Sequence, residues 1–214
     1  MLIFFVRHGL TDWNIQRRFQ GTYDVPLNDA GIVQAQTAAA RCAQLGLERI
    51  YHSTLARAAQ TAQIVADVSG VPLFPHTGFN EVCLGVFQGL NHDEAKAQYP
   101  EAYANYFVDR IHGAPPEGES LYQVRQRALK ALSFIEEEAK GCERIAVVSH
   151  GALLKALLGA IAGIPLESYA CYDVSNGSIS VVESKDGNRR LITLNAMAHF
   201  GDPYAEMSKT RLLI

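Results

Sequence analysis

Short apolar runs alternate along the chain with longer segments of helical periodicity. Residues 2–6 and residues 144–148 are two such runs, and each has the length of a buried strand. Between the runs, apolar residues recur every three or four positions, as on one face of a helix. Strands that alternate with helices are typical of a parallel sheet wrapped by helices. We therefore predict an α/β fold with three layers, α/β/α, and a mostly parallel sheet.

Capping residues indicate where the first helices begin and end. Asn28 stands at an N-cap position, and Gly46 ends the apolar repeat that follows it. Residues 49–52 predict a second strand, and a helix predicted over residues 55–69 ends at Gly70.

The second half of the chain predicts one long helix and a hairpin. Residues 119–140 keep helical periodicity throughout. Residues 179–183 and 191–195 predict two strands joined at Asp186-Gly187, a dipeptide that favours a tight hairpin turn.

Residues 76–118 are less regular, because glycines and prolines break them into short helical pieces such as residues 93–99. A cap or lid commonly grows from such a region. The chain has no internal repeat or linker, so we expect one domain over residues 1–214 with a small cap around residues 82–118.

Composition excludes several classes of protein. A net charge of −3 argues against a nucleic-acid surface, which usually carries an excess of Lys and Arg. No apolar stretch is long enough to span a bilayer, and no cationic signal region precedes the first one, so we expect a cytoplasmic protein. Without a C-x-x-C pair, we expect four reduced and mostly buried thiols: Cys42, Cys83, Cys142 and Cys171.

Two histidines occupy matching places. His8 and His150 each follow a predicted strand and precede a glycine, Gly9 or Gly151. The carboxyl ends of parallel strands meet at one edge of the sheet, so both imidazoles are expected in one crevice. Gly151 also opens a predicted helix, whose free amides favour an anion.

Two arginines belong to the same predicted crevice. Arg7 precedes His8, and Arg57 lies in the first turn of a helix that follows another strand. Guanidinium groups hold phosphate oxygens bidentately, so a phosphoryl group is the expected guest. A neutral imidazole is a competent nucleophile near pH 7, and Glu81, in an apolar stretch, is the candidate acid because partial burial would raise its pKa. Glu81 as a purely structural carboxylate is the alternative.

This chemistry needs no metal or cofactor. Other phosphatase types lack their motifs, since no Cys precedes an Arg by six positions and neither a D-x-D pair nor a phosphate-binding G-x-x-x-x-G-K-[ST] loop is present.

Several sequence blocks in order resemble the histidine phosphatase superfamily, also called the phosphoglycerate mutase-like family. The blocks are V-R-H-G-L-T-D-W-N at 6–14 with Q-G at 20–21, P-L-N-D-A-G at 26–31, S-T-L-A-R-A-A-Q-T at 53–61, Glu81 with G-V-F-Q-G at 85–89, E-G-E-S at 117–120 and V-S-H-G at 148–151. The resemblance implies a phosphohistidine at His8, protonation of the leaving oxygen by Glu81, and a set of residues that bind the phosphoryl group: Arg7, Asn14, Gln20, Gly21, Arg57, His150 and Gly151.

Departures from the family's mutases favour a phosphatase. The mutases that use bisphosphoglycerate follow their acid with Arg-His and carry a longer arginine-bearing insert. Here Val82-Cys83 follow Glu81, and Arg110 is the only arginine between Glu81 and Glu119. Gln88 stands where many family phosphatases have Glu, but it does not distinguish a phosphatase from a mutase.

We expect hydrolysis of a small phosphorylated metabolite. We expect no nucleic acid or membrane as partner, and a homodimer is left open. Seven aromatic residues are expected to line a pocket: Trp13, Phe19, Tyr23, Tyr99, Tyr103, Tyr106 and Phe107.

Three other functions remain open. One is a bisphosphoglycerate-dependent phosphoglycerate mutase, and another is a non-catalytic phospholigand binder on the same fold. The third is a serine hydrolase, because V-V-S-H-G at 147–151 nearly matches a nucleophile elbow, and Asp173 and His199 follow Ser149 in the matching order.

Overall fold

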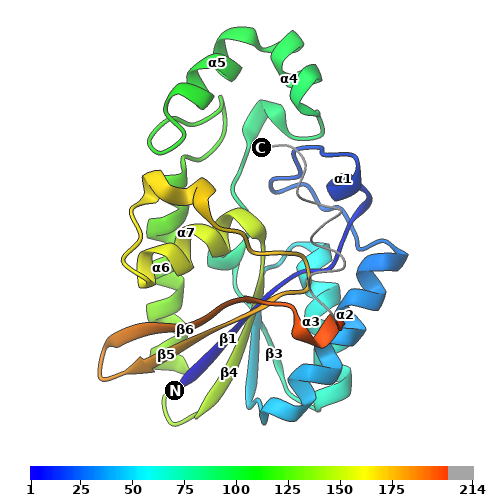
Figure 1. Ribbon diagram of the computed structural model, residues 1–214, viewed down its shortest axis with the longest axis vertical. Helices are drawn as coiled ribbons and strands as arrows, with labels where there is room; N and C mark the ends of the chain where they lie inside the picture. The colour runs from blue at the N-terminus through cyan, green and yellow to red at the C-terminus, as the bar shows by residue number, and fades with distance from the viewer. Residues whose placement is uncertain (202–214) are drawn as a thin grey trace.

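A six-stranded sheet forms the centre of the molecule in the computed structural model, which describes residues 1–201. The strand order is β3-β2-β4-β1-β5-β6 (Figure 1). The strands are β1 (Leu2–Arg7), β2 (Arg49–His52), β3 (Leu73–Pro75), β4 (Arg144–Ser149), β5 (Ile179–Lys185) and β6 (Asn188–Ala196).

Most of this sheet is parallel. Strand β1 pairs in parallel with β4, and β2 pairs in parallel with both β4 and β3. The last two strands differ, because β5 is antiparallel to β1 and to β6. The predicted hairpin is therefore confirmed, and its turn has left-handed backbone at Asp186 (φ 52°) and Gly187 (φ 78°), as a primed turn requires.

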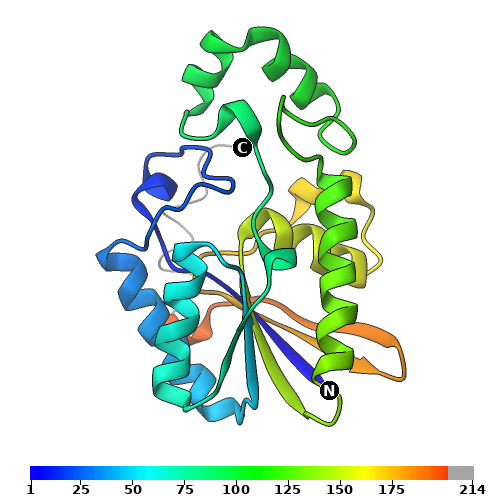
Figure 2. The ribbon, with the colours of Figure 1, turned by 180° about the vertical axis from the view of Figure 1, so that it is seen from behind.

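Helices cover both faces of the sheet, which confirms the three-layer prediction (Figures 1 and 2). Ile3 and Phe5 of β1 belong to a buried cluster shared with α6 (Leu121–Glu138) and α7 (Gly151–Ile161). Phe4 and Val6 belong to a second cluster shared with α2 (Asp29–Cys42) and α3 (Ala56–Ser69). Alternate side chains of one strand thus anchor opposite layers, so β1 lies in the interior on both faces.

The predicted capping residues lie at the beginnings and ends of the first helices. The Asn28 side chain accepts a hydrogen bond from the backbone of Gly31, 2.9 Å away, at the start of α2. Gly70 has left-handed backbone directly after α3, and Gly46 has it after the short turn that follows α2. No helix within residues 1–201 combines the length and the apolar character needed to cross a membrane.

Two further helices, α4 (His92–Gln98) and α5 (Pro100–Val108), lie beyond the carboxyl ends of β1 and β4 (Figures 1 and 2). The remaining short elements are α1 (Asp12–Ile15), η1 (Ala43–Leu45), η2 (Thr77–Phe79), η3 (Gly85–Phe87), η4 (Leu166–Cys171) and η5 (Ala198–Phe200). The sequence does not predict strand β3, because its three residues are too few to show a period. It does not predict helix α5 either, because that helix begins at Pro100, directly after α4.

The thiols differ from the expectation in one respect. All four cysteines are free, but only Cys42 is buried. Cys83 and Cys142 are partly exposed, and Cys171 is exposed on η4. The prediction of mostly buried thiols is therefore wrong, since a spacing pattern says nothing of where irregular segments lie.

Candidate active site

The two predicted histidines lie together at the end of the sheet. Strands β1 and β4 are in register with Arg7 opposite Ser149, so His8 and His150 leave the sheet side by side. Their ring centroids are 5.0 Å apart, and the two side chains are 2% and 0% exposed. Two residues far apart in sequence thus share one buried site.

A backbone contact orients the ring of His8. Its Nδ1 lies 2.6 Å from the carbonyl oxygen of Gly9, which can only accept a hydrogen bond. Nδ1 therefore carries the proton, and the neutral ring keeps a lone pair on Nε2. The carbonyls of His8 and Gly9 are held in turn by the side-chain amide of Asn176, at 3.0 and 3.3 Å.

A relay of polar side chains orients His150. Its Nε2 lies 2.7 Å from the Ser53 hydroxyl, and that hydroxyl donates to the side-chain oxygen of Asn80 at 2.9 Å. With the serine proton committed to Asn80, Nε2–H of His150 is the donor to Ser53. Nδ1 of His150 is buried and has no hydrogen-bond partner within residues 1–201.

Both predicted arginines reach this site from different layers. Nη1 of Arg7 donates to the carbonyl of Val174 at 2.6 Å, and the two Nη atoms of Arg57 donate to the carbonyls of Tyr23 and Gly21 at 2.9 and 2.7 Å. The Nε atoms of both arginines are buried without a partner in the described part of the chain. Buried donors are normally satisfied, so these positions suit an oxyanion.

The electrostatics of the four groups are coupled. Burial, helped by the charges of Arg57 and Arg7, lowers the pKa of His8 well below its ordinary value. Burial and the same charges lower the pKa of His150 as well. Burial also lowers the pKa of Arg57, to about 10, which leaves it cationic at neutral pH. The site thus combines neutral imidazoles with guanidinium charge.

Glu81 lies at the beginning of helix α7. Its carboxylate accepts backbone N–H groups from Ala152, Leu153 and Val82, each at 3.0 Å. Ala152 and Leu153 are in the first turn of α7, directly after His150 and Gly151. The side chain therefore lies beside the second histidine, on amides that helix N-termini offer to anions.

The remaining predicted phosphate ligands surround the site less directly. The side-chain oxygen of Asn14 accepts hydrogen bonds from Thr11, which leaves its NH₂ group free to donate. Gln20 is buried, and Gly21 contributes the carbonyl bound by Arg57. No hydrogen bond within residues 1–201 joins Asn14 or Gln20 to either histidine, and the Gly151 amide is not among the donors to Glu81. Their binding roles stay predictions.

Several residues of the site were not predicted as functional. Ser53 and Asn80 orient His150, and the hydroxyl of Thr61 accepts from the backbone of Gly9 at 3.2 Å. Arg127 and Glu119 hold the backbone around Glu81. Ser53, Thr61 and Glu119 lie inside recognised sequence blocks, and Asn80 precedes Glu81, but Arg127 lies on a helix face with no local signal.

Ser149 is placed unsuitably for a nucleophile. Its hydroxyl is fully buried and donates to the carbonyl of Phe79 at 2.7 Å. Asp173 pairs with Lys155, and Nε2 of His199 bonds the carbonyl of Gly177. The three residues do not form a catalytic triad, so the geometry argues against the serine hydrolase.

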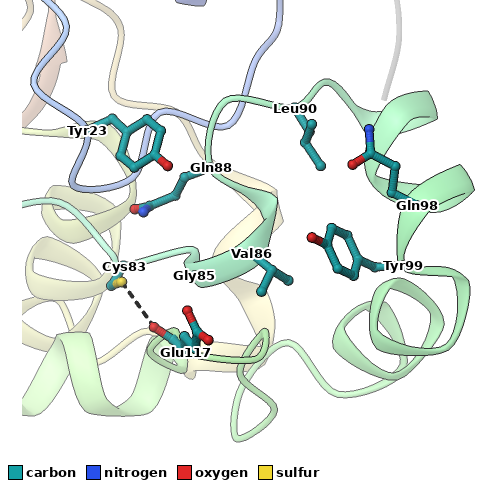
Figure 3. Close-up of a pocket in the computed structure, with 9 residues that line it drawn as sticks. All are labelled: Tyr23, Cys83, Gly85, Val86, Gln88, Leu90, Gln98, Tyr99 and Glu117. Carbon is teal, nitrogen blue, oxygen red and sulfur yellow. Dashed lines mark hydrogen bonds between the residues drawn. The ribbon is translucent and has the colours of Figure 1, made fainter.

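A cleft of about 480 Å³ lies beside the loop at residues 21–23, whose carbonyls also bind Arg57. It is lined by Tyr23, Cys83, Gly85, Val86, Gln88, Leu90, Gln98, Tyr99 and Glu117 (Figure 3). Gln88 accepts from the backbone of Thr22 at 2.7 Å, and the carbonyl of Tyr23 accepts from Arg57, so the cleft and the cationic site share the loop at residues 21–23. None of the lining residues is cationic.

The predicted aromatic pocket is only partly correct. Tyr23 and Tyr99 line the cleft, but Trp13, Phe19, Tyr103, Tyr106 and Phe107 are not among its lining residues. Phe19, Tyr103 and Tyr106 pack around Phe87 at centroid distances of 5.9, 6.1 and 5.8 Å. These rings form the interior beneath α4 and α5, because aromatic side chains spaced along short helices pack together more readily than they face solvent.

No group of three His, Cys, Asp or Glu side chains in the described residues is arranged to hold a metal ion.

Comparisons with known proteins agree with this geometry. The model of the histidine phosphatase superfamily (branch 1) matches residues 3–197. The chain is 42% identical over 155 residues to phosphoglycerate mutase-like protein 4 of Arabidopsis thaliana, covering 71% of this chain and 67% of that protein.

Two solved structures are also similar. The alpha-ribazole phosphatase of Shigella flexneri has a TM-score of 0.85 and 26% identity, covering 92% of this chain and 96% of that one. The mycobacterial glucosyl-3-phosphoglycerate phosphatase in complex with VO3 has a TM-score of 0.81 and 29% identity, covering 92% and 99%.

Proposed function

The chain belongs to the histidine phosphatase superfamily (branch 1), and we propose that it hydrolyses small phosphomonoesters through a phosphohistidine on His8, without a metal. The observation that carries this proposal is the neighbourhood of the two histidines, whose buried rings lie 5.0 Å apart beside two arginines. Burial, together with the charges of those arginines, lowers the pKa of both rings. A lone pair on Nε2 and fixed positive charge are what phosphoryl transfer to an imidazole requires.

The first step forms the phosphoenzyme. Nε2 of His8 attacks the phosphorus, the P–Nε2 bond forms and the P–O ester bond breaks. Glu81, in its protonated form, gives its proton to the leaving oxygen, so the product leaves as a neutral alcohol. Arg7 and Arg57 stabilise the charge on the equatorial oxygens. His150 stabilises the same charge after taking up a proton from solvent on Nδ1, which the bound phosphoryl anion favours, while its Nε2–H stays on Ser53.

The second step releases phosphate. A water molecule attacks the phosphorus in line with His8, and the Glu81 carboxylate takes a proton from it. The P–Nε2 bond breaks, inorganic phosphate leaves, and His8 returns to the neutral state held by Gly9. Glu81 is protonated again, so the cycle closes without another reactant.

We place the leaving group in the cleft beside residues 21–23, with residues 82–118 as a cap over it. Its polar lining consists of phenols, amides, the Cys83 thiol and the carboxylate of Glu117, with no Arg or Lys (Figure 3). Such a surface suits hydroxyl groups and disfavours a second anionic group, because the Glu117 carboxylate would repel it.

A mutase is the second candidate, because one relative is named phosphoglycerate mutase-like protein 4 and another, from Escherichia coli, is named a probable phosphoglycerate mutase. The cleft argues against it, since a phosphoglycerate leaving group carries a carboxylate that needs a cation. Arg110, the only arginine of residues 82–118, lies over the rings of Tyr106 and Phe107, at 5.6 and 5.1 Å.

One assay separates the candidates. The purified protein is incubated with p-nitrophenyl phosphate, with neutral sugar phosphates, and with 3-phosphoglycerate plus bisphosphoglycerate. Release of inorganic phosphate from the first two supports the phosphatase. Interconversion of phosphoglycerates without net phosphate release supports the mutase, and no turnover of any ester supports a phospholigand binder.

A further inference from the structure

We propose that Arg127 is a positioning residue that fixes the Glu81 carboxyl for proton transfer by clamping the backbone of residues 78–83 against helix α6. This inference rests on the function proposed above, because it assumes that Glu81 is the acid.

The clamp consists of hydrogen bonds from one guanidinium to three carbonyls. Nη1 of Arg127 donates to the carbonyls of Gly78 and Asn80, at 3.0 and 2.8 Å. Nη2 donates to the carbonyl of Glu81 itself, at 3.3 Å. The segment begins within η2, ends before η3 and belongs to no strand, so its carbonyls depend on such side-chain donors.

Glu119 completes the clamp on the other side of Glu81. Its carboxylate accepts hydrogen bonds from Nε and Nη2 of Arg127 in a bidentate pair, at 3.0 and 2.9 Å. The same carboxylate accepts the backbone N–H of Cys83 at 3.0 Å. The side chains of Arg127 and Glu119 are 25% and 27% exposed, so the pair is partly shielded from water. The backbone is thus held on both sides of the acid.

Arg127 has no donor left for a substrate. A guanidinium has five N–H groups. One from Nε and one from Nη2 go to Glu119, and the other three go to the carbonyls of residues 78, 80 and 81. Arg7 and Arg57 differ, because each keeps an Nε without a partner in the described chain. Arg127 therefore acts through the segment and not on the phosphoryl group.

The held segment carries both the acid and the side chain at the end of the relay that orients His150. Its Asn80 oxygen accepts from Ser53, which orients His150, and its Glu81 carboxylate lies on the first turn of α7. A shift of this backbone moves the acid away from the leaving oxygen before it disturbs His8, which is held separately by Gly9 and Asn176. Loss of the clamp should thus affect proton donation more than nucleophilic attack.

Dependence on the leaving group tests this prediction. Phenyl phosphate has a poor leaving group and needs the acid, whereas p-nitrophenyl phosphate has a good one and needs it little. The measured quantity is the ratio of kcat/KM for phenyl phosphate to kcat/KM for p-nitrophenyl phosphate, in the wild type, Arg127→Lys and Arg127→Met. Because it is a ratio, it does not depend on the fraction of folded protein.

We expect this ratio to fall about tenfold or more in both Arg127 variants, since a misplaced acid loses part of the roughly 10²- to 10⁴-fold that general acids contribute. Arg125→Met is the matched control, because Arg125 lies on the same helix and stacks over Tyr122. It should leave the ratio unchanged.

An unchanged ratio in Arg127→Lys and Arg127→Met, with or without an equal loss for both esters, would overturn the inference and assign Arg127 a purely structural role. A fall of the same size in Arg125→Met would also overturn it. Failure of the proposed function is read separately, from a wild-type protein that hydrolyses neither ester.

Discussion

The imidazole rings of His8 and His150 face one another with their centroids 5.0 Å apart and their planes at 58°. They reach this arrangement because β1 and β4 are adjacent parallel strands in register. One ring is held through Nδ1 by Gly9 and the other through Nε2 by Ser53, so their remaining nitrogens are available to a phosphoryl group. Five predictions follow from the site built around this pair.

Glu81→Gln should slow phosphoryl transfer from phenyl phosphate by about 10²-fold or more, because the amide cannot donate a carboxyl proton to the leaving oxygen. The amide oxygen can still accept from the first turn of α7, so the fold should be preserved. Stopped-time assays of kcat/KM for phenyl and p-nitrophenyl phosphate measure the effect. Equal loss for both esters would argue that Glu81 is structural.

Gly151→Ala should weaken binding of inorganic phosphate roughly tenfold, which corresponds to part of one charge-assisted hydrogen bond. A Cβ at Gly151 would lie 2.9 Å from Cζ of Arg7, and Arg7 is fixed on its other side by Val174. The guanidinium must therefore move. The inhibition constant of phosphate measures this, and an unchanged constant would show that Arg7 does not hold the anion.

The free energy of unfolding should decrease as the pH falls below about 6.5. Burial lowers the folded-state pKa of both His8 and His150, so below the ordinary histidine pKa the unfolded chain takes up protons that the folded chain does not. The folded state then loses about 1.4 kcal/mol per pH unit for each histidine. Urea unfolding at pH 7.0 and pH 5.5 measures the slope.

Replacement of these histidines provides the control for that slope. His8→Asn and His150→Asn should each make the pH dependence shallower, because each removes one proton-binding group from the unfolded chain. Partly buried His92 and His199, whose pKa values burial also lowers, remain in both variants as background. A slope that neither substitution alters would contradict the assignment of buried, neutral rings.

Activity toward p-nitrophenyl phosphate should survive dialysis against EDTA, because Arg7 and Arg57 supply the positive charge that metal ions supply in other phosphatases. Orthovanadate, as a phosphate mimic, should inhibit the dialysed protein. Loss of turnover on dialysis, with recovery on adding Mg²⁺ or Zn²⁺, would require a metal mechanism.

Local signals were sufficient for much of the fold. The short apolar runs of β1 and β4, the cap at Asn28 and the glycines after the first helices act within a few residues, and all are confirmed. Strand β3 and helix α5 were not predicted, because they lack such local signals. Strand β3 depends on pairing with β2, and helix α5 depends on the aromatic cluster around Phe87, and neither contact lies within a few residues of sequence.

The candidate site shows a similar limit. Strand ends predicted that His8 and His150 converge, because parallel pairing requires it. The residues that orient the site were not predictable, since the hydrogen bonds from Ser53 to Asn80 and from Arg127 to the Glu81 carbonyl form only through tertiary folding. A guanidinium that binds backbone carbonyls has no periodicity or motif, so only coordinates reveal it.

The central claim is that His8 carries the phosphoryl group during turnover. The most direct measurement is an alkaline quench of the Glu81→Gln variant reacting with p-nitrophenyl phosphate, followed by mass spectrometry of its peptides. In this variant the good leaving group still departs, but water is no longer activated, so the intermediate accumulates. We predict a phosphoryl group on Nε2 of His8 that disappears when His8→Asn is added. A phosphoryl group on Ser149 or any other residue, or turnover that persists in the His8→Asn variant, would contradict the account.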